Sequence, residues 1–343
     1  MNFTSGQLYF INEKDTATGA RSEYYKIGIV RNAAERKSKD RLLEHQTGNP
    51  RRLYIYEVLD TKAVEVVETN LHHLLARNRI LGEWMRFSEL QLQNAISMAK
   101  QLVMEVKENL EYFERAQELK NKISNGLKID ATEEAKSNYA VIQNFEPIRK
   151  SCDEVLDEYK KYLRLAIDQG FDVAGRGTIQ NKSGYRFDEK LFRKKYPTLF
   201  EKFAEISYPV KGSFLPIASK RWSPNLEVID RDHIDLISNL KKELINADFS
   251  MDTVFSLHEK HLGVKECKKY AEWKIEIAKT KLKVFTGEND GIEGICNWKR
   301  KNVEVVTLDK KRLETQHPDE FKLCFVQGPE ISSLITNKGA GLN

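Results

Sequence analysis

The chain has 343 residues, of which 40% are hydrophobic and 31% are charged, and its net charge is +5. This composition excludes a disordered chain and allows two or three domains. No apolar stretch reaches the ~18 residues of a membrane span, and no signal peptide is visible at the start, so we expect a cytoplasmic protein without membrane contact. The four cysteines are far apart and form no C-x-x-C pair, which argues against a zinc knuckle or a disulfide framework and favours a reducing compartment.

Positive charge is concentrated in the middle of the chain. Residues 159–222 contain 14 Lys and Arg against 6 Asp and Glu, whereas residues 105–158 contain 8 against 13. Such a basic segment is typical of a nucleic-acid-binding surface, but a solvated lysine-rich surface has the same composition.

The first 88 residues predict a small α+β domain. Residues 7–11 and 25–30 are rich in β-branched and aromatic residues and predict two strands of a hairpin with a long connection. A helix is expected over 34–46, a third strand over 53–59 and a second helix over 63–78, where apolar residues recur at helical spacing. We therefore expect a small antiparallel sheet flanked by helices.

The remainder predicts long helices and an internal repeat. Residues 89–158 form a helical connector, which could also mediate homo-oligomerisation. Residues 187–203 (FDEKLFRKKYPTLFEKF) align with residues 308–324 (LDKKRLETQHPDEFKLC) without a gap. This repeat predicts two small α/β modules, a basic copy at 159–222 and a second copy at 266–343, separated by a helical linker at 223–265.

The N-terminal domain contains several residues of types that are common in active sites, and their spacing suggests that they lie close together. Arg41 and His45 are four residues apart on one helix and share a face, and so do Glu68 and His72 on the other. A hairpin packed on both helices could bring these side chains to Tyr9 on the first strand.

Hydrolysis of a phosphodiester requires such a set. A base must deprotonate water, and a guanidinium and a divalent cation must neutralise charge on the phosphate. Glu68 supplies an oxygen ligand for Mg²⁺ or Mn²⁺, and water and substrate phosphate would supply most of the others.

The same segment resembles the GIY-YIG nuclease superfamily, and in particular its phage-type branch. The resemblance covers about residues 7–88 and rests on Gln7-Leu8-Tyr9, Lys26-Ile27-Gly28 and the stretches RLLEHQTGNP, ETNLHHLL and GEWM. It implies a catalytic set in which Glu68 also binds the metal: Tyr9, Lys26, Arg41, His45 and Glu68.

Lys26 departs from the superfamily pattern, since most members have a tyrosine at this position. The neighbouring Tyr25 would point to the opposite face of the strand. Lys26 is therefore either a general base or a phosphate-binding cation.

The C-terminal repeat has a weaker resemblance. GIEGICNWKRK (291–301) followed by LDKKRLETQHPDEF is similar to the tail segment of phage recombination exonucleases of the YqaJ, λ-exonuclease-like type. This implies an accessory nucleic-acid-binding role, with charge and stacking surface from Trp298, Lys299, Arg300 and Lys301 and from Lys220, Arg221 and Trp222. A buried tryptophan with surface lysines on either side is the alternative.

These observations predict a metal-dependent DNA endonuclease with C-terminal nucleic-acid-binding modules, of phage, prophage or mobile-element context. If phage-encoded, it would act in the host cytoplasm. One alternative is a catalytically inactive GIY-YIG-like domain that binds DNA or regulates another protein. Another is an interaction protein whose helices bind a host protein.

Overall fold

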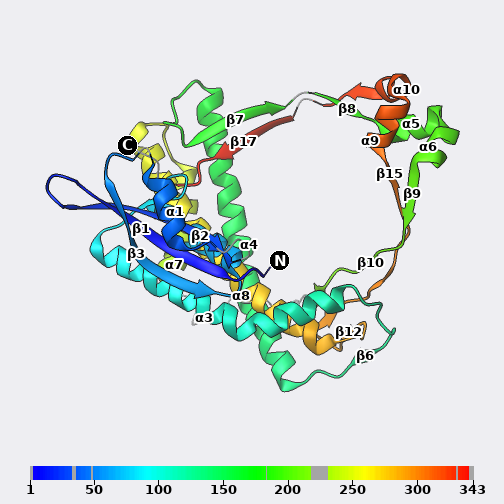
Figure 1. The fold of residues 1–343 in the computed structure, drawn as a ribbon, viewed down its shortest axis with the longest axis horizontal. Helices are drawn as coiled ribbons and strands as arrows, with labels where there is room; N and C mark the ends of the chain where they lie inside the picture. Colours follow the sequence, from blue (N-terminus) through cyan, green and yellow to red (C-terminus); the bar gives the residue numbers. More distant parts are fainter. Residues whose placement is uncertain are drawn as a thin grey trace.

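The computed structural model describes residues 3–32, 36–47, 49–182, 184–217, 231–329 and 331–339, with the side chains of 231–233 left out. The predicted α+β class is confirmed: a small antiparallel sheet at the N-terminus is followed by long helices and further small sheets (Figure 1). None of the helices in these ranges combines the length and apolar character of a membrane span.

The N-terminal domain is built on a five-stranded antiparallel sheet in the order β3-β1-β2-β5-β4. Its strands are β1 (Gly6–Lys14), β2 (Arg21–Arg31), β3 (Arg52–Thr61), β4 (Arg79–Leu81) and β5 (Trp84–Arg86). The three long strands occur where the sequence predicts them. The short β4–β5 hairpin is not among the strands expected from the sequence, and Gly82, with φ of 57°, forms its turn.

The two faces of this sheet are covered by different helices. Leu8, Phe10 and Ile27 point toward α2 (Val64–Leu74) and α3 (Glu89–Lys120) and belong to the largest apolar core. Tyr9 and Ile11 point to the opposite face, where α1 (Ser38–Gln46) packs. Alternation along the strand thus places Tyr9 on the side that carries α1. The remaining element of this domain is a 3₁₀ turn, η2 (Ala76–Asn78).

A helical body supports the N-terminal domain. It consists of α3, α4 (Glu133–Asp168), α7 (Arg231–Ile245) and α8 (Met251–Thr286). The ring of Phe113 on α3 stacks on Trp273 of α8 with centroids 5.9 Å apart, and the indole nitrogen of Trp273 donates to Glu105 at 2.6 Å. The helix α3 therefore shares a core with both the sheet and α8.

The body also carries a small sheet in the order β11-β13-β12-β6. Its strands are β6 (Lys128–Ile129), β11 (Leu215–Pro216), β12 (Gly291–Ile292) and β13 (Cys296–Asn297). The strand β6 lies between α3 and α4, within the segment expected to be a helical connector.

The repeated segments form a single lobe. One copy contributes β8 (Tyr185–Phe187), α5 (Glu189–Lys195), α6 (Pro197–Phe203) and β9 (Ala204–Ser207). The other contributes β15 (Val305–Leu308), α9 (Lys310–Gln316), α10 (Pro318–Lys322) and β16 (Phe325–Gln327). The first strand of each copy pairs with the last strand of the other, β8 with β16 and β15 with β9.

Aligned residues have the same structural role in the two copies. Asp188 and Asp309 cap their helices, and each accepts a 3.0 Å hydrogen bond from a backbone amide. Phe192 and Leu313 are both fully buried in one shared apolar cluster. The sequence divides these copies into two modules, whereas the structure joins their helices around one core.

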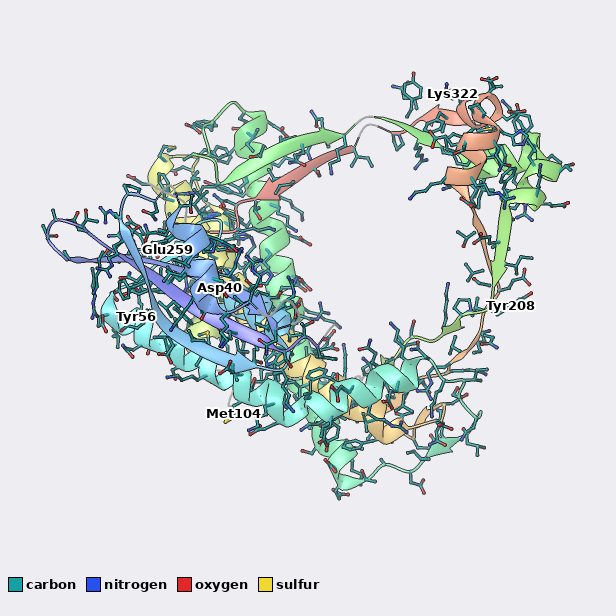
Figure 2. The ribbon with its side chains drawn as sticks, in the orientation of Figure 1. Asp40, Tyr56, Met104, Tyr208, Glu259 and Lys322 are labelled. Atoms are coloured by element: carbon teal, nitrogen blue, oxygen red, sulfur yellow. The ribbon has the colours of Figure 1, made fainter. Side chains whose placement is uncertain are left out.

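Two β-ribbons connect the lobe to the body (Figure 1). One pairs β7 (Gly177–Lys182) with β17 (Ile331–Thr336), and the other pairs β10 (Val210–Lys211) with β14 (Lys301–Asn302). In Figure 2, Lys322 on the lobe lies on the opposite side of the view from Asp40 in the N-terminal domain. The lobe thus stands apart from the sheet that carries the candidate site.

Candidate active site

Tyr9 and His45 form the centre of the candidate site. The β1–β2 register sets Tyr9 opposite Gly28, where a Cβ atom would lie only 2.5 Å from the phenol oxygen. Glycine at this position therefore gives the tyrosine side chain its space. Tyr9 is only 1% exposed, and its hydroxyl lies 3.3 Å from Nε2 of His45 on α1.

Burial sets the protonation states of this pair. It raises the pKa of Tyr9, although a hydrogen bond and positive charge from Arg41 act in the opposite direction. Burial, and then the charges of Lys26 and Arg41, lower the pKa of His45. Both groups are therefore neutral at neutral pH, and the imidazole can accept the phenol proton.

Arg41 lies one helical turn before His45 and is 32% exposed. Its Nη1 donates to Glu44 at 2.5 Å, an ion pair near the surface that contributes little to stability. The guanidinium can therefore exchange this contact for a phosphate at small cost.

Lys26 is paired with a carboxylate that the sequence analysis does not assign to the site. Its ammonium forms an ion pair with Glu83, from the turn between β4 and β5, and its side chain is only 12% exposed. Tyr25 lies on the other face of the strand, as predicted, where its ring meets Tyr56 edge to face at 5.6 Å. Tyr25 therefore cannot occupy the position of Lys26.

Glu68, on α2, is a second carboxylate in this region. Burial, and next the negative charge of Glu83, raise its pKa to about 7. Its side chain is still 19% exposed, so a cation and water can reach it.

His72, one turn after Glu68, is a neutral neighbour. Burial, followed by the charge of Arg79, lowers its pKa to about 4. Its Nε2 lies 3.1 Å from the carbonyl oxygen of Ile27, so this nitrogen carries the proton and donates. Nε2 of His72 lies 4.0 Å from Glu68, but the histidine is uncharged at neutral pH, so the two residues form no ion pair at that pH.

Few protein ligands are available to a divalent cation at the candidate site. Within the described ranges, no group of three or more His, Cys, Asp or Glu side chains could hold a metal ion. Mg²⁺ commonly uses one or two carboxylates and completes its shell with water and substrate phosphate. Glu68 fits this type of site, because a nearby cation would relieve its unfavourable environment.

The predicted nucleic-acid-binding residues of the C-terminal part require a correction. Trp298 and Arg300 are 2% and 1% exposed, and the guanidinium of Arg300 lies 3.9 Å from the centroid of the indole ring. Arg300 also donates to the carbonyl of Gly287 at 2.7 Å. These two side chains are core residues, and they offer no stacking surface to DNA.

The neighbouring Lys299 and Lys301 are exposed, as in the buried-tryptophan alternative. The other predicted group, Lys220, Arg221 and Trp222, lies outside the described residues.

Sequence reasoning missed two charged residues of the site. Glu83 neutralises the charge of Lys26 and raises the pKa of Glu68, and Arg79 lowers the pKa of His72. The signal for Glu83 was available, since it is the central residue of the Gly82-Glu83-Trp84 motif. The motif contributes to the family resemblance, but that resemblance assigns no role to its glutamate.

Comparison with known proteins finds one match, at the N-terminus. Residues 6–100 match the T5orf172 domain, which is found in phage proteins and in proteins related to GIY-YIG-like nucleases. No curated protein and no solved structure matches the chain. The matched segment includes Tyr9, Lys26, Arg41, His45 and Glu68, so the candidate site lies within a part of the chain similar to a phage-type, nuclease-related or DNA-binding domain.

Proposed function

We propose that the chain is a metal-dependent DNA endonuclease and that its N-terminal domain hydrolyses phosphodiester bonds. The observation that carries this proposal is the buried contact between Tyr9 and the neutral His45, with Arg41 beside the phenol. The match to the T5orf172 domain supports a nuclease-related or DNA-binding role in a phage context.

Tyr9 and His45 together supply the base. As water attacks phosphorus, its proton passes to the phenol oxygen of Tyr9, and the phenol proton passes to Nε2 of His45. The new bond joins the water oxygen to phosphorus, and the bond from phosphorus to the leaving sugar oxygen breaks. The proton remains on His45 until it is lost to solvent or to the leaving oxygen.

Arg41 neutralises the charge that develops on the phosphate oxygens. Lys26 has a different role in this proposal, because its charge is already compensated by Glu83. It holds Glu83 beside Glu68 and makes the surroundings of His45 more positive. Lys26 is thus a positioning residue.

Glu68 is the residue that would hold Mg²⁺ or Mn²⁺, with water and phosphate as further ligands. A bound cation would polarise the phosphate and stabilise the negative charge of the attacked group. Below about pH 7, Glu68 is mostly protonated and must lose its proton before it can bind the cation, and this step couples metal binding to pH.

Cleavage assays test this function. The full chain is incubated with supercoiled plasmid, linear duplex, single-stranded and branched DNA, with Mg²⁺ or Mn²⁺ and with EDTA as control. We expect cleavage of at least one substrate, and its loss with EDTA and in Glu68→Ala. DNA binding without cleavage under every condition would instead support an inactive DNA-binding or regulatory domain. Absence of both would support a protein-interaction role.

A further inference from the structure

A cavity of about 490 Å³ lies between the N-terminal domain, the helices α4 and α8, and the strand β17. The hydrolysis proposed above makes no use of it. Its lining contains six strongly basic side chains: Arg79, Lys160, Lys265, Lys268, Lys269 and Lys338. Basic side chains from β4, α4 and α8 and from the segment after β17 therefore bring positive charge to one concave site.

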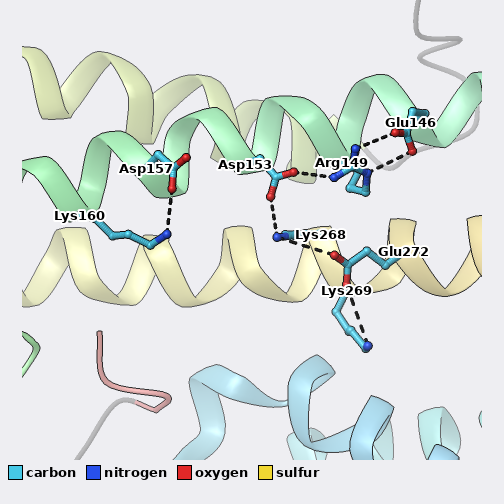
Figure 3. A network of polar contacts seen from close by, with 8 residues as sticks. All are labelled: Glu146, Arg149, Asp153, Asp157, Lys160, Lys268, Lys269 and Glu272. Carbon is cyan, nitrogen blue, oxygen red and sulfur yellow. Dashed lines mark hydrogen bonds and ion pairs between the residues drawn. The ribbon is translucent and has the colours of Figure 1, made fainter. Parts of the chain in front are cut away.

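Three carboxylates of the lining neutralise only half of these cations. Figure 3 shows the ion pairs, which involve α4 and α8. The distances are 2.8 Å from Lys160 to Asp157, 2.5 Å from Lys268 to Asp153 and 4.0 Å from Lys269 to Glu272.

The other three cations have neutral partners or none among the described residues. Lys265 donates to the hydroxyl of Thr336 at 3.2 Å and to the carbonyl of Asn337 at 3.3 Å. Arg79 donates to the carbonyl of Gly82 at 2.6 Å. Within the described ranges, no carboxylate lies at ion-pair distance from Lys265, Arg79 or Lys338. The cavity thus has an excess of positive charge that an anion would neutralise.

Two further observations favour an anion as the occupant of this cavity. His261 lines the cavity, is fully buried, and neither ring nitrogen has a hydrogen-bond partner in the described part of the chain. Burial, and next the charges of Lys160, Lys338 and Lys268, lower the pKa of Lys265 to about 8. Buried polar groups without partners and cations that repel one another are costly unless a ligand compensates them.

The cavity adjoins the candidate active site. His72 lines it and lies 4.0 Å from Glu68, and Arg79 lines it as well. We propose that this cavity binds backbone phosphates of the DNA strand that continues from the bond to be cleaved. This proposal rests on the proposed function, and it names a second substrate contact that fixes the position of the strand.

A matched pair of lysines tests the proposal. Lys160 and Lys161 are neighbours on α4, and each forms an ion pair with the carboxylate three residues earlier, at 2.8 and 2.7 Å. Only Lys160 lines the cavity. The variants Lys160→Met, Lys338→Met and Lys161→Met are prepared in the full chain carrying Glu68→Ala, so that bound DNA stays intact. Affinity for a short labelled duplex is measured by fluorescence anisotropy over a range of salt concentrations.

We expect Lys160→Met and Lys338→Met each to weaken duplex binding about tenfold and to reduce the slope of log affinity against log salt by about one, because one phosphate contact is lost. Lys161→Met should change neither. Equal effects of Lys160→Met and Lys161→Met, or no effect of the cavity variants, would overturn the proposal. Adenosine monophosphate and pyrophosphate are tested as competitors. If these competitors bind and Lys160→Met abolishes their binding but leaves duplex affinity unchanged, the cavity is a site for a free nucleotide. That result would also overturn the proposal.

The binding experiment tests the cavity whether or not the chain cleaves DNA. If the chain with an intact Glu68 cleaves no DNA but Lys160→Met still weakens duplex binding selectively, the nuclease function fails and the phosphate site stands. If that chain cleaves DNA and the cavity variants bind normally, the cavity proposal alone fails.

Discussion

The phenol oxygen of Tyr9, a residue that is only 1% exposed, lies 3.3 Å from Nε2 of His45. A neutral phenol cannot deprotonate water alone at neutral pH, since burial raises its pKa. It can do so when a neutral imidazole takes its own proton at the same time. The two residues are therefore expected to act as a unit.

The first prediction concerns this unit. Tyr9→Phe and His45→Gln should each lower kcat by about 10²–10⁴, and the double variant should be no worse than the more damaging single variant. Because His45 must be neutral, activity should fall as pH drops below its lowered pKa, and this acid limb should vanish in His45→Gln. Initial cleavage rates from pH 5 to 8 provide the measurement, and additive losses would show that the two residues act separately.

Arg41 should contribute to turnover far more than to binding. Arg41→Ala is expected to lower kcat by about 10²–10³ with little change in duplex affinity, because the charge it neutralises develops in the transition state. Lys39→Ala, an exposed position on the same helix, is the control. A loss of affinity as large as the loss in kcat would make Arg41 a phosphate anchor.

Protons and the metal should compete for Glu68. Its pKa of about 7 means that the carboxyl is mostly protonated below that pH, so a cation must displace a proton to bind. The Mg²⁺ concentration for half-maximal cleavage should therefore rise about tenfold for each pH unit below 7 and level off above 7. Titration of Mg²⁺ at several pH values checks this, and a metal requirement that is independent of pH would contradict it.

The same pKa predicts a stability effect in the absence of metal. The folded-state pKa of Glu68 is raised from 4.5 to about 7, so its contribution to stability is fully present below pH 4.5 and is lost as pH rises through 7. Glu68→Gln carries no charge and avoids this loss. At pH 8 with EDTA, we expect the variant to be more stable than the unmodified chain by about 1–3 kcal/mol, since the charged carboxylate is desolvated. At pH 4 the difference should disappear. Urea unfolding at both values measures it, and equal stability at pH 8 would refute the prediction.

The parts of the site that follow from local pattern could be predicted from sequence. Alternation along β1 and β2 places Tyr9 and Tyr25 on opposite faces, and helical spacing places His45 one turn after Arg41. Glu83 could not be assigned in this way, because its contact with Lys26 requires the β4–β5 hairpin to pair with β2 across more than fifty residues of chain. Similarly, the repeat is visible in the sequence, but the exchange of strands between the two copies is not.

The Trp298–Lys301 segment shows that amino-acid composition alone does not establish a DNA-binding surface. Its one aromatic and three basic residues are of the types found in such surfaces. In the extended chain, however, successive side chains point to opposite sides, so Trp298 and Arg300 are buried while Lys299 and Lys301 are exposed. The lysine content correctly predicts a basic surface. Stacking on DNA would also require the indole of Trp298 to face solvent, and composition says nothing about the direction of a side chain.

The last prediction separates two roles of Lys26. As a positioning residue, Lys26 lowers the pKa of His45 through its charge and compensates Glu83. Lys26→Met should then move the acid limb of the pH–rate profile to higher pH, because His45 loses a cation while Glu83, which raises its pKa, is left unpaired. The limb should return toward its original position in Lys26→Met/Glu83→Gln, and Lys26→Arg should keep most of the activity, since the charge survives.

As a general base, Lys26 would instead be indispensable: Lys26→Met and Lys26→Arg would both remove the pH-dependent limb, and the Glu83→Gln change would rescue neither. Near-full activity of Lys26→Met with an unshifted profile would contradict both roles, and it would leave the Tyr9–His45 pair to function without help from this strand position.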